Sequence, residues 1–178
     1  DIPNLIDDRV INYPEDAKEL IDRIVEVEIR ERTEKLKESG SVDIKDHNSK
    51  VSASEELEPQ VIIIDEYADL LDQLEDDSSE FEKKIRRIAQ RARSVGIHLV
   101  IATQKPSAQI IDTDLRSNLD ARAAFRVPSV SDSRVILDDG GAEKLSGEGD
   151  MIFKQGDNQV RLQGTFLDPD TLKKIISE

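Results

Sequence analysis

The sequence predicts an α/β fold with a mainly parallel central sheet flanked by helices. Short runs of continuously apolar residues, such as VIII at 61–64 and IHLVI at 97–101, alternate with segments whose apolar residues recur at helical spacing. Strands that are apolar without alternation are typical of parallel sheets buried on both faces. The 178 residues, with four Phe, two Tyr and no Trp, suit one domain over 1–178 with an aliphatic core.

The first third of the chain predicts a long helix followed by a linker and a strand. Residues 15–38 have helical spacing, few breakers and Pro14 at their start, which favours a helix N-terminus. Residues 39–58 are polar and poor in large apolar side chains, which predicts a flexible linker. The strand over 61–64 follows.

The rest of the chain predicts further alternation, ending in a hairpin. The expected elements are a helix over 79–95 ended by Gly96, a buried strand over 97–104, a short helix leading into a strand over 121–127, a helix capped by Ser131 or Asp132, a hairpin turning at 156–158 and a helix opened by Pro169. His98 lies within a strand pattern, which favours a structural role over metal binding.

Composition limits the partners that the chain is expected to have. A net charge of −14 argues against coating by nucleic acid, although Lys83–Arg93 forms a local basic run. That run predicts either a solvated helix face or a contact with a neighbouring subunit. The sequence has no Cys, no apolar run long enough for a membrane span and no signal peptide. We therefore expect a cytoplasmic segment without membrane contact.

Two adjacent carboxylates, Asp65 and Glu66, follow the first buried strand. An apolar strand that ends in Asp-Glu has the pattern of a Walker B segment, in which the first carboxylate holds Mg²⁺ and the second polarises the attacking water. Thr103 and Gln104 end the next strand, and at the carboxyl edge of a parallel sheet they are expected to contact the nucleotide, with Gln104 sensing its γ-phosphate or positioning the attacking water. The alternative is that the residues after the strand are simply acidic.

The matching phosphate-binding loop is absent from this sequence. G-x-x-x-x-G-K-[ST] does not occur, and the glycines of DDGGAEKLSGEGD lie among acids that repel phosphate. The chain alone is therefore expected to bind ATP poorly and to be inactive without a part that carries the Walker A loop.

A series of segments resembles the motor domain of the FtsK/SpoIIIE family of DNA translocases, within the wider FtsK–HerA group of RecA-like ATPases. The similar segments are IPNL, INYPEDAKELIDRIVEVEIRERTEKL, DIKDHNSKV, VIIIDEYADLL, IRRIAQRARSVGIHLVIATQKPS, SNLDARAAFRVPSVSDSRVILDDGGAEKLSGEGDMIF and VRLQGTF. The resemblance covers essentially the whole chain. It implies the part of a RecA-like P-loop NTPase that follows Walker A, working as a homohexameric ring on double-stranded DNA with ATP and Mg²⁺. It leaves open chromosome segregation, plasmid transfer and DNA defence, and a membrane anchor elsewhere in the full-length protein.

The same resemblance implies roles for individual residues. Asp65 resembles the Mg²⁺ ligand, Glu66 the catalytic base and Gln104 the polar sensor. Arg122 is similar to the family's arginine finger, with a strand-flanking Arg paired to an acid as the alternative. Arg134 is the competing candidate for the finger, or a residue that faces DNA. Lys154 and Arg161 on the hairpin are candidates for phosphate contacts or ordinary hairpin charges.

Two other functions remain open from the sequence. One is a degenerate RecA-like module that lost ATPase activity and serves in assembly, although the retained Asp65, Glu66, Gln104 and Arg122 argue against decay. The other is a stand-alone Mg²⁺-dependent hydrolase built on Asp65, Glu66 and Asp69. The sequence offers no further acids that would converge on such a site.

Overall fold

The computed structural model describes residues 10–177, which fall into two compact units. The N-terminal unit is Ile11–Lys105, and the C-terminal unit comprises, among the described residues, Val10 and residues 106–177. Each unit has a small sheet of its own. The expectation of one motor domain over 1–178 stays a prediction. The IPNL match lies outside the described residues.

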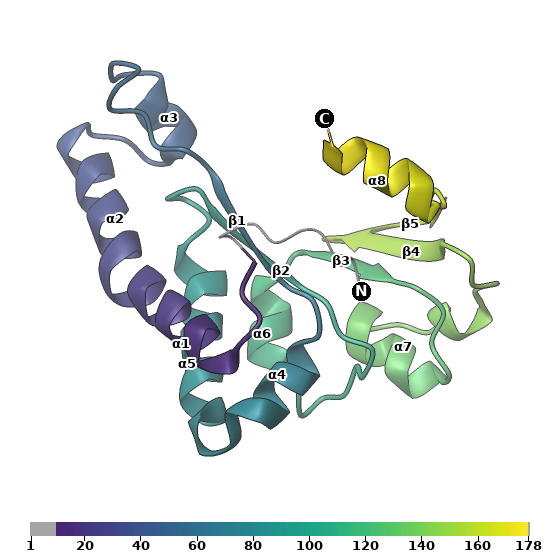
Figure 1. The fold of residues 1–178 in the computed structure, drawn as a ribbon. Helices are drawn as coiled ribbons and strands as arrows, with labels where there is room; N and C mark the ends of the chain where they lie inside the picture. The colour runs from purple at the N-terminus through teal and green to yellow at the C-terminus, as the bar shows by residue number, and fades with distance from the viewer. Residues whose placement is uncertain (1–9, 178) are drawn as a thin grey trace. The chain divides into compact units, whose positions relative to one another are not determined.

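The N-terminal unit has a two-stranded parallel sheet with helices on one of its faces (Figure 1). Its elements are α1 (Pro14–Arg23), the π-helical η1 (Ile24–Glu28), α2 (Ile29–Glu38), α3 (Ile44–Asn48), β1 (Gln60–Ile64), α4 (Tyr67–Leu74), the 3₁₀ turn η2 (Glu75–Asp77), α5 (Ser78–Arg91) and β2 (Ile97–Ile101). β1 pairs with β2 in parallel, with Gln60 opposite Ile97 and Ile64 opposite Ile101. The predicted long helix and both predicted strands are confirmed.

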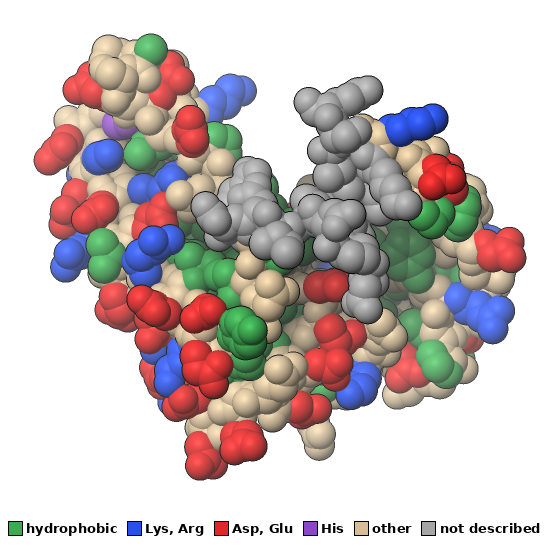
Figure 2. Space-filling model, viewed as in Figure 1, with side chains coloured by type: hydrophobic (Ala, Val, Ile, Leu, Met, Phe, Trp, Pro, Cys, Tyr) green, Lys and Arg blue, Asp and Glu red, His purple; other side chains and the backbone are tan. Residues whose placement is uncertain are grey.

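The core of this unit joins the long first helix to α5. Its buried residues include Ile21, Ile24, Val25, Phe81, Ile85 and Ile88 of α1, η1 and α5, together with Tyr67 of α4 and Ile97 of β2. Basic residues of α5 pair with acids of the first helix, with 2.8 Å between Lys84 Nζ and Asp22 Oδ1 and 3.2 Å between Arg87 Nη1 and Glu26 Oε1. Figure 2 shows acidic and basic side chains intermixed over the helices of this unit. Part of the basic run is therefore neutralised locally, as expected of a helix face.

One face of the β1–β2 sheet is apolar and exposed. Val61, Ile63 and Val100 are 61%, 70% and 46% exposed, and His98 beside Val61 is exposed as well. The expectation that these strands are buried on both faces is therefore wrong for this side. The physical reason is that the described helices cover only the opposite face, so that alternate side chains of both strands have no apolar neighbour layer.

Residues 39–58, where a flexible linker is expected, have a defined hydrogen-bonded arrangement. The side-chain amide of Asn48 makes two hydrogen bonds to the backbone of Leu57. Asn48 Nδ2 donates to the Leu57 carbonyl oxygen at 2.9 Å, and Asn48 Oδ1 accepts from the Leu57 nitrogen at 2.9 Å. His47 is buried, with Nδ1 2.8 Å from Ser39 Oγ and Nε2 3.3 Å from the Glu55 carbonyl. Polar side chains thus supply the contacts that the segment lacks in apolar residues, which a composition argument does not detect.

Gly96 turns the chain into β2, although it is not the helix cap that the sequence suggests. α5 ends at Arg91, and Gly96 has φ +80°. A Cβ built on it would lie 2.3 Å from Ile44 Cδ1 of α3. Gly40 also has positive φ, +61°, but open space around the Cβ position.

We therefore expect Gly96→Ala to destabilise the N-terminal unit by about 2–3 kcal/mol and Gly40→Ala by about 1 kcal/mol. Both substitutions strain a left-handed backbone, and only the first also displaces Ile44. Amide hydrogen exchange of β1 and β2 in the full-length protein measures the difference. Equal protection in the two variants would contradict the packing of α3 on this turn.

The C-terminal unit has a three-stranded antiparallel sheet with helices (Figure 1). Its elements are α6 (Thr113–Asn118), β3 (Ala121–Ala124), α7 (Val130–Leu137), the 3₁₀ turn η3 (Ala142–Lys144), β4 (Asp150–Gln155), β5 (Asn158–Gln163) and α8 (Pro169–Ser177). Its buried apolar cluster consists of Ala124, Leu137, Ala142, Leu145 and Ile152. The predicted hairpin and C-terminal helix are confirmed.

Two details of this unit differ from the sequence prediction. β3 ends at Ala124 and pairs antiparallel with β4, because the hairpin folds back on it. α7 is capped by Ser129, whose Oγ accepts from the Asp132 backbone nitrogen at 3.1 Å, and neither Ser131 nor Asp132 is the cap. No helix among residues 10–177 is long and apolar enough to cross a bilayer.

Candidate active site

The Glu66 carboxylate is held at the carboxyl end of the parallel sheet. The Tyr67 backbone nitrogen donates to the Ala102 carbonyl at 2.9 Å, which continues the β1–β2 pairing past the last strand residues. Glu66 Oε1 accepts from the Thr103 hydroxyl at 2.5 Å, and Oε2 accepts from the Gln104 backbone nitrogen at 2.7 Å. Glu66, Thr103 and Gln104 therefore meet as predicted. The region around Arg122, expected to converge with them as a third strand end, instead lies on β3, in the antiparallel sheet.

Asp65 precedes Glu66 and leaves its side chain exposed. Mg²⁺ in nucleotide sites is bound through one or two carboxylates together with substrate phosphates and water. A single exposed carboxylate at the strand end fits that donor set, and its role as the Mg²⁺ ligand stays a prediction. No group of three or more metal-ligating side chains occurs in the part of the chain that the structure describes.

The Gln104 side chain is exposed while its backbone amide binds Glu66. Beside it, Lys105 Nζ lies 3.0 Å from Asp69 Oδ1. The hydrogen bond from Lys105 to this carboxylate, aided by the charges of Asp69, Asp72 and Glu66, raises the pKa of Lys105. The sequence did not single out this ion pair, and its only signal was the position of Lys105 directly after Gln104.

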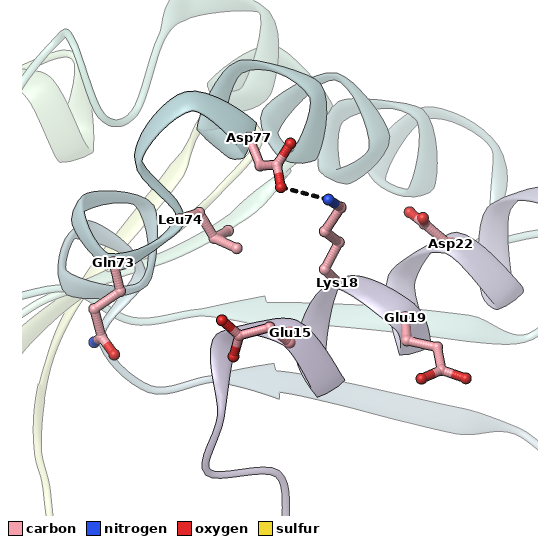
Figure 3. Close-up of a pocket in the computed structure, with 7 residues that line it drawn as sticks. All are labelled: Glu15, Lys18, Glu19, Asp22, Gln73, Leu74 and Asp77. Carbon is pink, nitrogen blue, oxygen red and sulfur yellow. Dashed lines mark hydrogen bonds and ion pairs between the residues drawn. The ribbon is translucent and has the colours of Figure 1, made fainter.

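A separate hollow on the N-terminal unit is lined by acidic residues of α1 and η2. Figure 3 shows its lining residues: Glu15, Lys18, Glu19, Asp22, Gln73, Leu74 and Asp77. Its volume is about 370 Å³, and Lys18, its one basic lining residue, pairs with Asp77. The remaining carboxylates would repel phosphate, so this hollow does not suit a nucleotide.

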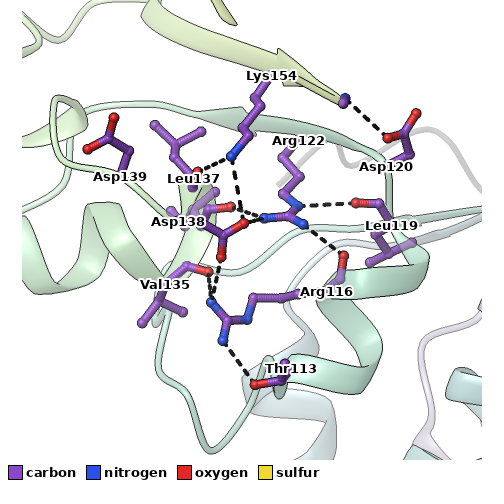
Figure 4. A network of polar contacts seen from close by, with 12 residues as sticks. Thr113, Arg116, Leu119, Asp120, Arg122, Val135, Leu137, Asp138, Asp139 and Lys154 are labelled. Carbon is purple, nitrogen blue, oxygen red and sulfur yellow. Dashed lines mark hydrogen bonds and ion pairs between the residues drawn. The ribbon is translucent and has the colours of Figure 1, made fainter. Parts of the chain in front are cut away.

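Arg122, the candidate arginine finger, lies in the C-terminal unit with its guanidinium fully engaged (Figure 4). Its nitrogens donate to the carbonyls of Leu119, Ile136 and Arg116 at 3.1, 3.2 and 3.0 Å, and to Asp138 Oδ2 at 2.5 Å. This arrangement is the alternative considered from the sequence, an Arg beside a strand that pairs with an acid. A finger role stays a prediction and would require these contacts to break.

Asp138 is the centre of this network, and the sequence analysis missed it. Lys154 Nζ and Arg116 Nη1 lie 3.7 and 3.2 Å from its carboxylate, and Lys154 also donates to the Leu137 carbonyl at 2.6 Å. The hydrogen bond from Arg122, with the charges of all three cations, lowers the pKa of Asp138. Asp138 has φ +61° at the C-cap of α7. The Asp-Asp-Gly-Gly run after a helical segment was the signal for this left-handed cap.

The other two candidate DNA contacts differ in their surroundings. Arg161 binds Asp150 through two nitrogens, at 2.8 and 2.6 Å, and this pairing lowers the pKa of Asp150, which is 6% exposed. Arg134 is exposed and pairs with no residue by a hydrogen bond or ion pair within 10–177. Arg134 and Arg161 are both exposed, but Arg161 is paired with Asp150, and Lys154 is largely buried.

The sequence of this chain is similar to one protein family and to curated proteins that share one name. The family model described as FtsK/SpoIIIE family matches residues 1–108. Proteins named DNA translocase FtsK from Bacillus cereus and Streptococcus pyogenes are each 41% identical to this chain, over 98% and 99% of it. The chain spans 23% of the length of both relatives.

Solved structures show the same fold. The pCW3 conjugation coupling protein TcpA, solved with ATPγS, matches with a TM-score of 0.84 and 29% identity over 94% of this chain and 50% of that chain. The type VII secretion ATPase EccC of Thermomonospora curvata matches with a TM-score of 0.73 and 23% identity over 90% of this chain and 19% of that chain. The α/β P-loop ATPase fold, with a parallel sheet and a C-terminal hairpin, is therefore confirmed.

Proposed function

We propose, because this chain belongs to the FtsK/SpoIIIE family, that it is part of an ATP-driven motor that moves double-stranded DNA. The observation that carries the proposal is the carboxylate Glu66, fixed at the end of β1 beside the tip of β2. The relatives named DNA translocase and the ATPγS-bound TcpA support it.

Each residue of the site has a defined part in this proposal. Bound Mg²⁺ would neutralise charge on the transferred phosphoryl group. Asp65 would hold that ion, and Glu66 would accept a hydrogen bond from the attacking water and orient it. The exposed Gln104 side chain would contact the nucleotide, while its backbone keeps Glu66 in place.

The phosphate-binding loop would come from another part of the same protein. The exposed apolar face of Val61, Ile63 and Val100 supports this, because such a face needs a covering layer in a P-loop ATPase. The chain spans only half of TcpA and less than a quarter of the FtsK relatives, which leaves ample length for that layer. The 178 residues by themselves are then inactive.

A homohexameric ring around DNA is the assembly that we propose. Both cations of the hairpin β4–β5, Lys154 and Arg161, are paired with carboxylates, so each subunit would grip DNA weakly, and a ring multiplies that contact through effective concentration. Such a motor would work in the cytoplasm, where it meets both ATP and chromosomal DNA.

The test is the ATPase rate of the full-length protein with and without double-stranded DNA. We expect hydrolysis that rises several-fold with linear duplex, while residues 1–178 alone hydrolyse nothing. The rival function is a degenerate scaffold module. An inactive full-length protein, with or without DNA, would favour the scaffold and overturn the motor.

A further inference from the structure

The Thr103 hydroxyl takes part in two hydrogen bonds, one as acceptor and one as donor to the Glu66 carboxylate. The Lys105 backbone nitrogen donates to Thr103 Oγ1 at 3.1 Å, and Oγ1 lies 2.5 Å from Glu66 Oε1. Because the hydroxyl accepts from Lys105 and the carboxylate has no proton to give, the Thr103 proton points at Glu66. The hydrogen bond from Lys105 to Thr103 Oγ1 polarises the hydroxyl and strengthens its hydrogen bond to Glu66.

The second carboxylate oxygen is held by the same strand tip. Glu66 Oε2 accepts from the Gln104 backbone nitrogen at 2.7 Å, so both oxygens of Glu66 are bound to consecutive residues of the β2 end. A carboxylate held at two points has one orientation, and its remaining lone pairs point in fixed directions. The side chain of Gln104 itself stays exposed.

We propose that Thr103 is a positioning residue for Glu66, and that the Thr103–Gln104 tip couples nucleotide contact at Gln104 to the orientation of the base. This inference rests on the proposed function. It gives Thr103 a different task from the nucleotide contact that the sequence predicts. A shift of the β2 tip when the Gln104 side chain meets a phosphate moves both donors of Glu66 together, because they belong to adjacent residues.

The test compares Thr103→Val with Thr103→Ser in the full-length protein, by the steady-state kinetics of ATP hydrolysis with duplex DNA. Val keeps the shape of Thr without the hydroxyl, and Ser keeps the hydroxyl. We expect Val to lower kcat about 10-fold, the value of one hydrogen bond to a charged group, with KM for ATP changed less than about 3-fold. Ser should stay within about 2-fold of wild type in both constants. Thr33→Val, which removes a hydroxyl bound to the Ile29 carbonyl of α2, is the matched control and should leave kcat unchanged.

A second measurement separates positioning of Glu66 from general damage. In single-turnover hydrolysis, Thr103→Val added to Glu66→Gln should cause no further loss, because the base whose orientation Thr103 fixes is already absent. Equal kcat for the Val variant and wild type, a Ser variant as slow as Val, or a full additional loss in the double variant would each overturn the inference and leave the motor intact. If the wild-type protein hydrolyses no ATP, the proposed function and this inference both fall. A raised KM with unchanged kcat would instead return Thr103 to direct nucleotide contact.

Discussion

Glu66→Gln in the full-length protein is expected to lower kcat for ATP about 10²- to 10⁴-fold, the range that a positioned general base contributes. The amide is the same size as the carboxylate and can still accept one of the two hydrogen bonds from Thr103 and Gln104. It cannot orient and polarise water as the carboxylate does. We therefore expect ATP binding, measured by equilibrium titration, to survive the change.

Glu56→Gln is the control for this substitution, because Glu56 is exposed in the loop before β1. Its kcat should equal that of wild type. Wild-type hydrolysis by the Glu66→Gln variant would remove Glu66 as the base and leave the observed hydrogen bonds with a structural role. Loss of both ATP binding and hydrolysis would indicate that the carboxylate supports the nucleotide site itself.

The sequence was most informative where the chain uses local rules. The apolar runs predicted β1 and β2, and their polar endings predicted that Glu66, Thr103 and Gln104 would meet, because parallel strands end at one edge of a sheet. The hairpin was predictable from Gly156 and the alternation around it. These features depend on a few neighbouring residues and on strand direction.

The sequence was least informative where contacts link distant residues. Asn48 and His47 order the segment over 39–58 through hydrogen bonds to Leu57, Glu55 and Ser39, and no periodic pattern marks such contacts. The exposed side of β1 and β2 could not be predicted either, because local apolarity does not say which element covers a strand.

The partners of Arg122 were equally hidden. Its contact with Asp138 spans 16 residues, and it depends on the left-handed cap of α7 as well as on the antiparallel pairing of β3 with β4. Sequence reasoning left a finger and a structural ion pair as equal alternatives. The two alternatives predict different outcomes for one substitution.

Arg122→Gln is expected to destabilise the C-terminal unit by about 2–4 kcal/mol. The guanidinium side chain is 18% exposed, and its loss removes one donor each from the carbonyls of Leu119, Ile136 and Arg116 and from Asp138. Asp138 keeps its contacts with Arg116 and Lys154. Arg122→Lys should recover little of this, because one ammonium group cannot reproduce the planar set of donors. Hydrogen exchange of the β3 and β4 amides in the full-length protein should accelerate roughly 30-fold or more, since protection follows local stability.

Arg134→Gln provides the contrast. Arg134 is exposed on α7, so its substitution should leave amide hydrogen exchange in β3 and β4 unchanged. ATPase rates then assign the finger. A loss of activity in Arg134→Gln with normal protection places the finger at Arg134. Normal protection together with lost activity in Arg122→Gln would show that the guanidinium leaves Asp138 in the proposed ring, and the finger would belong to Arg122. Because the Arg122 guanidinium makes four internal contacts, we expect the finger to be Arg134.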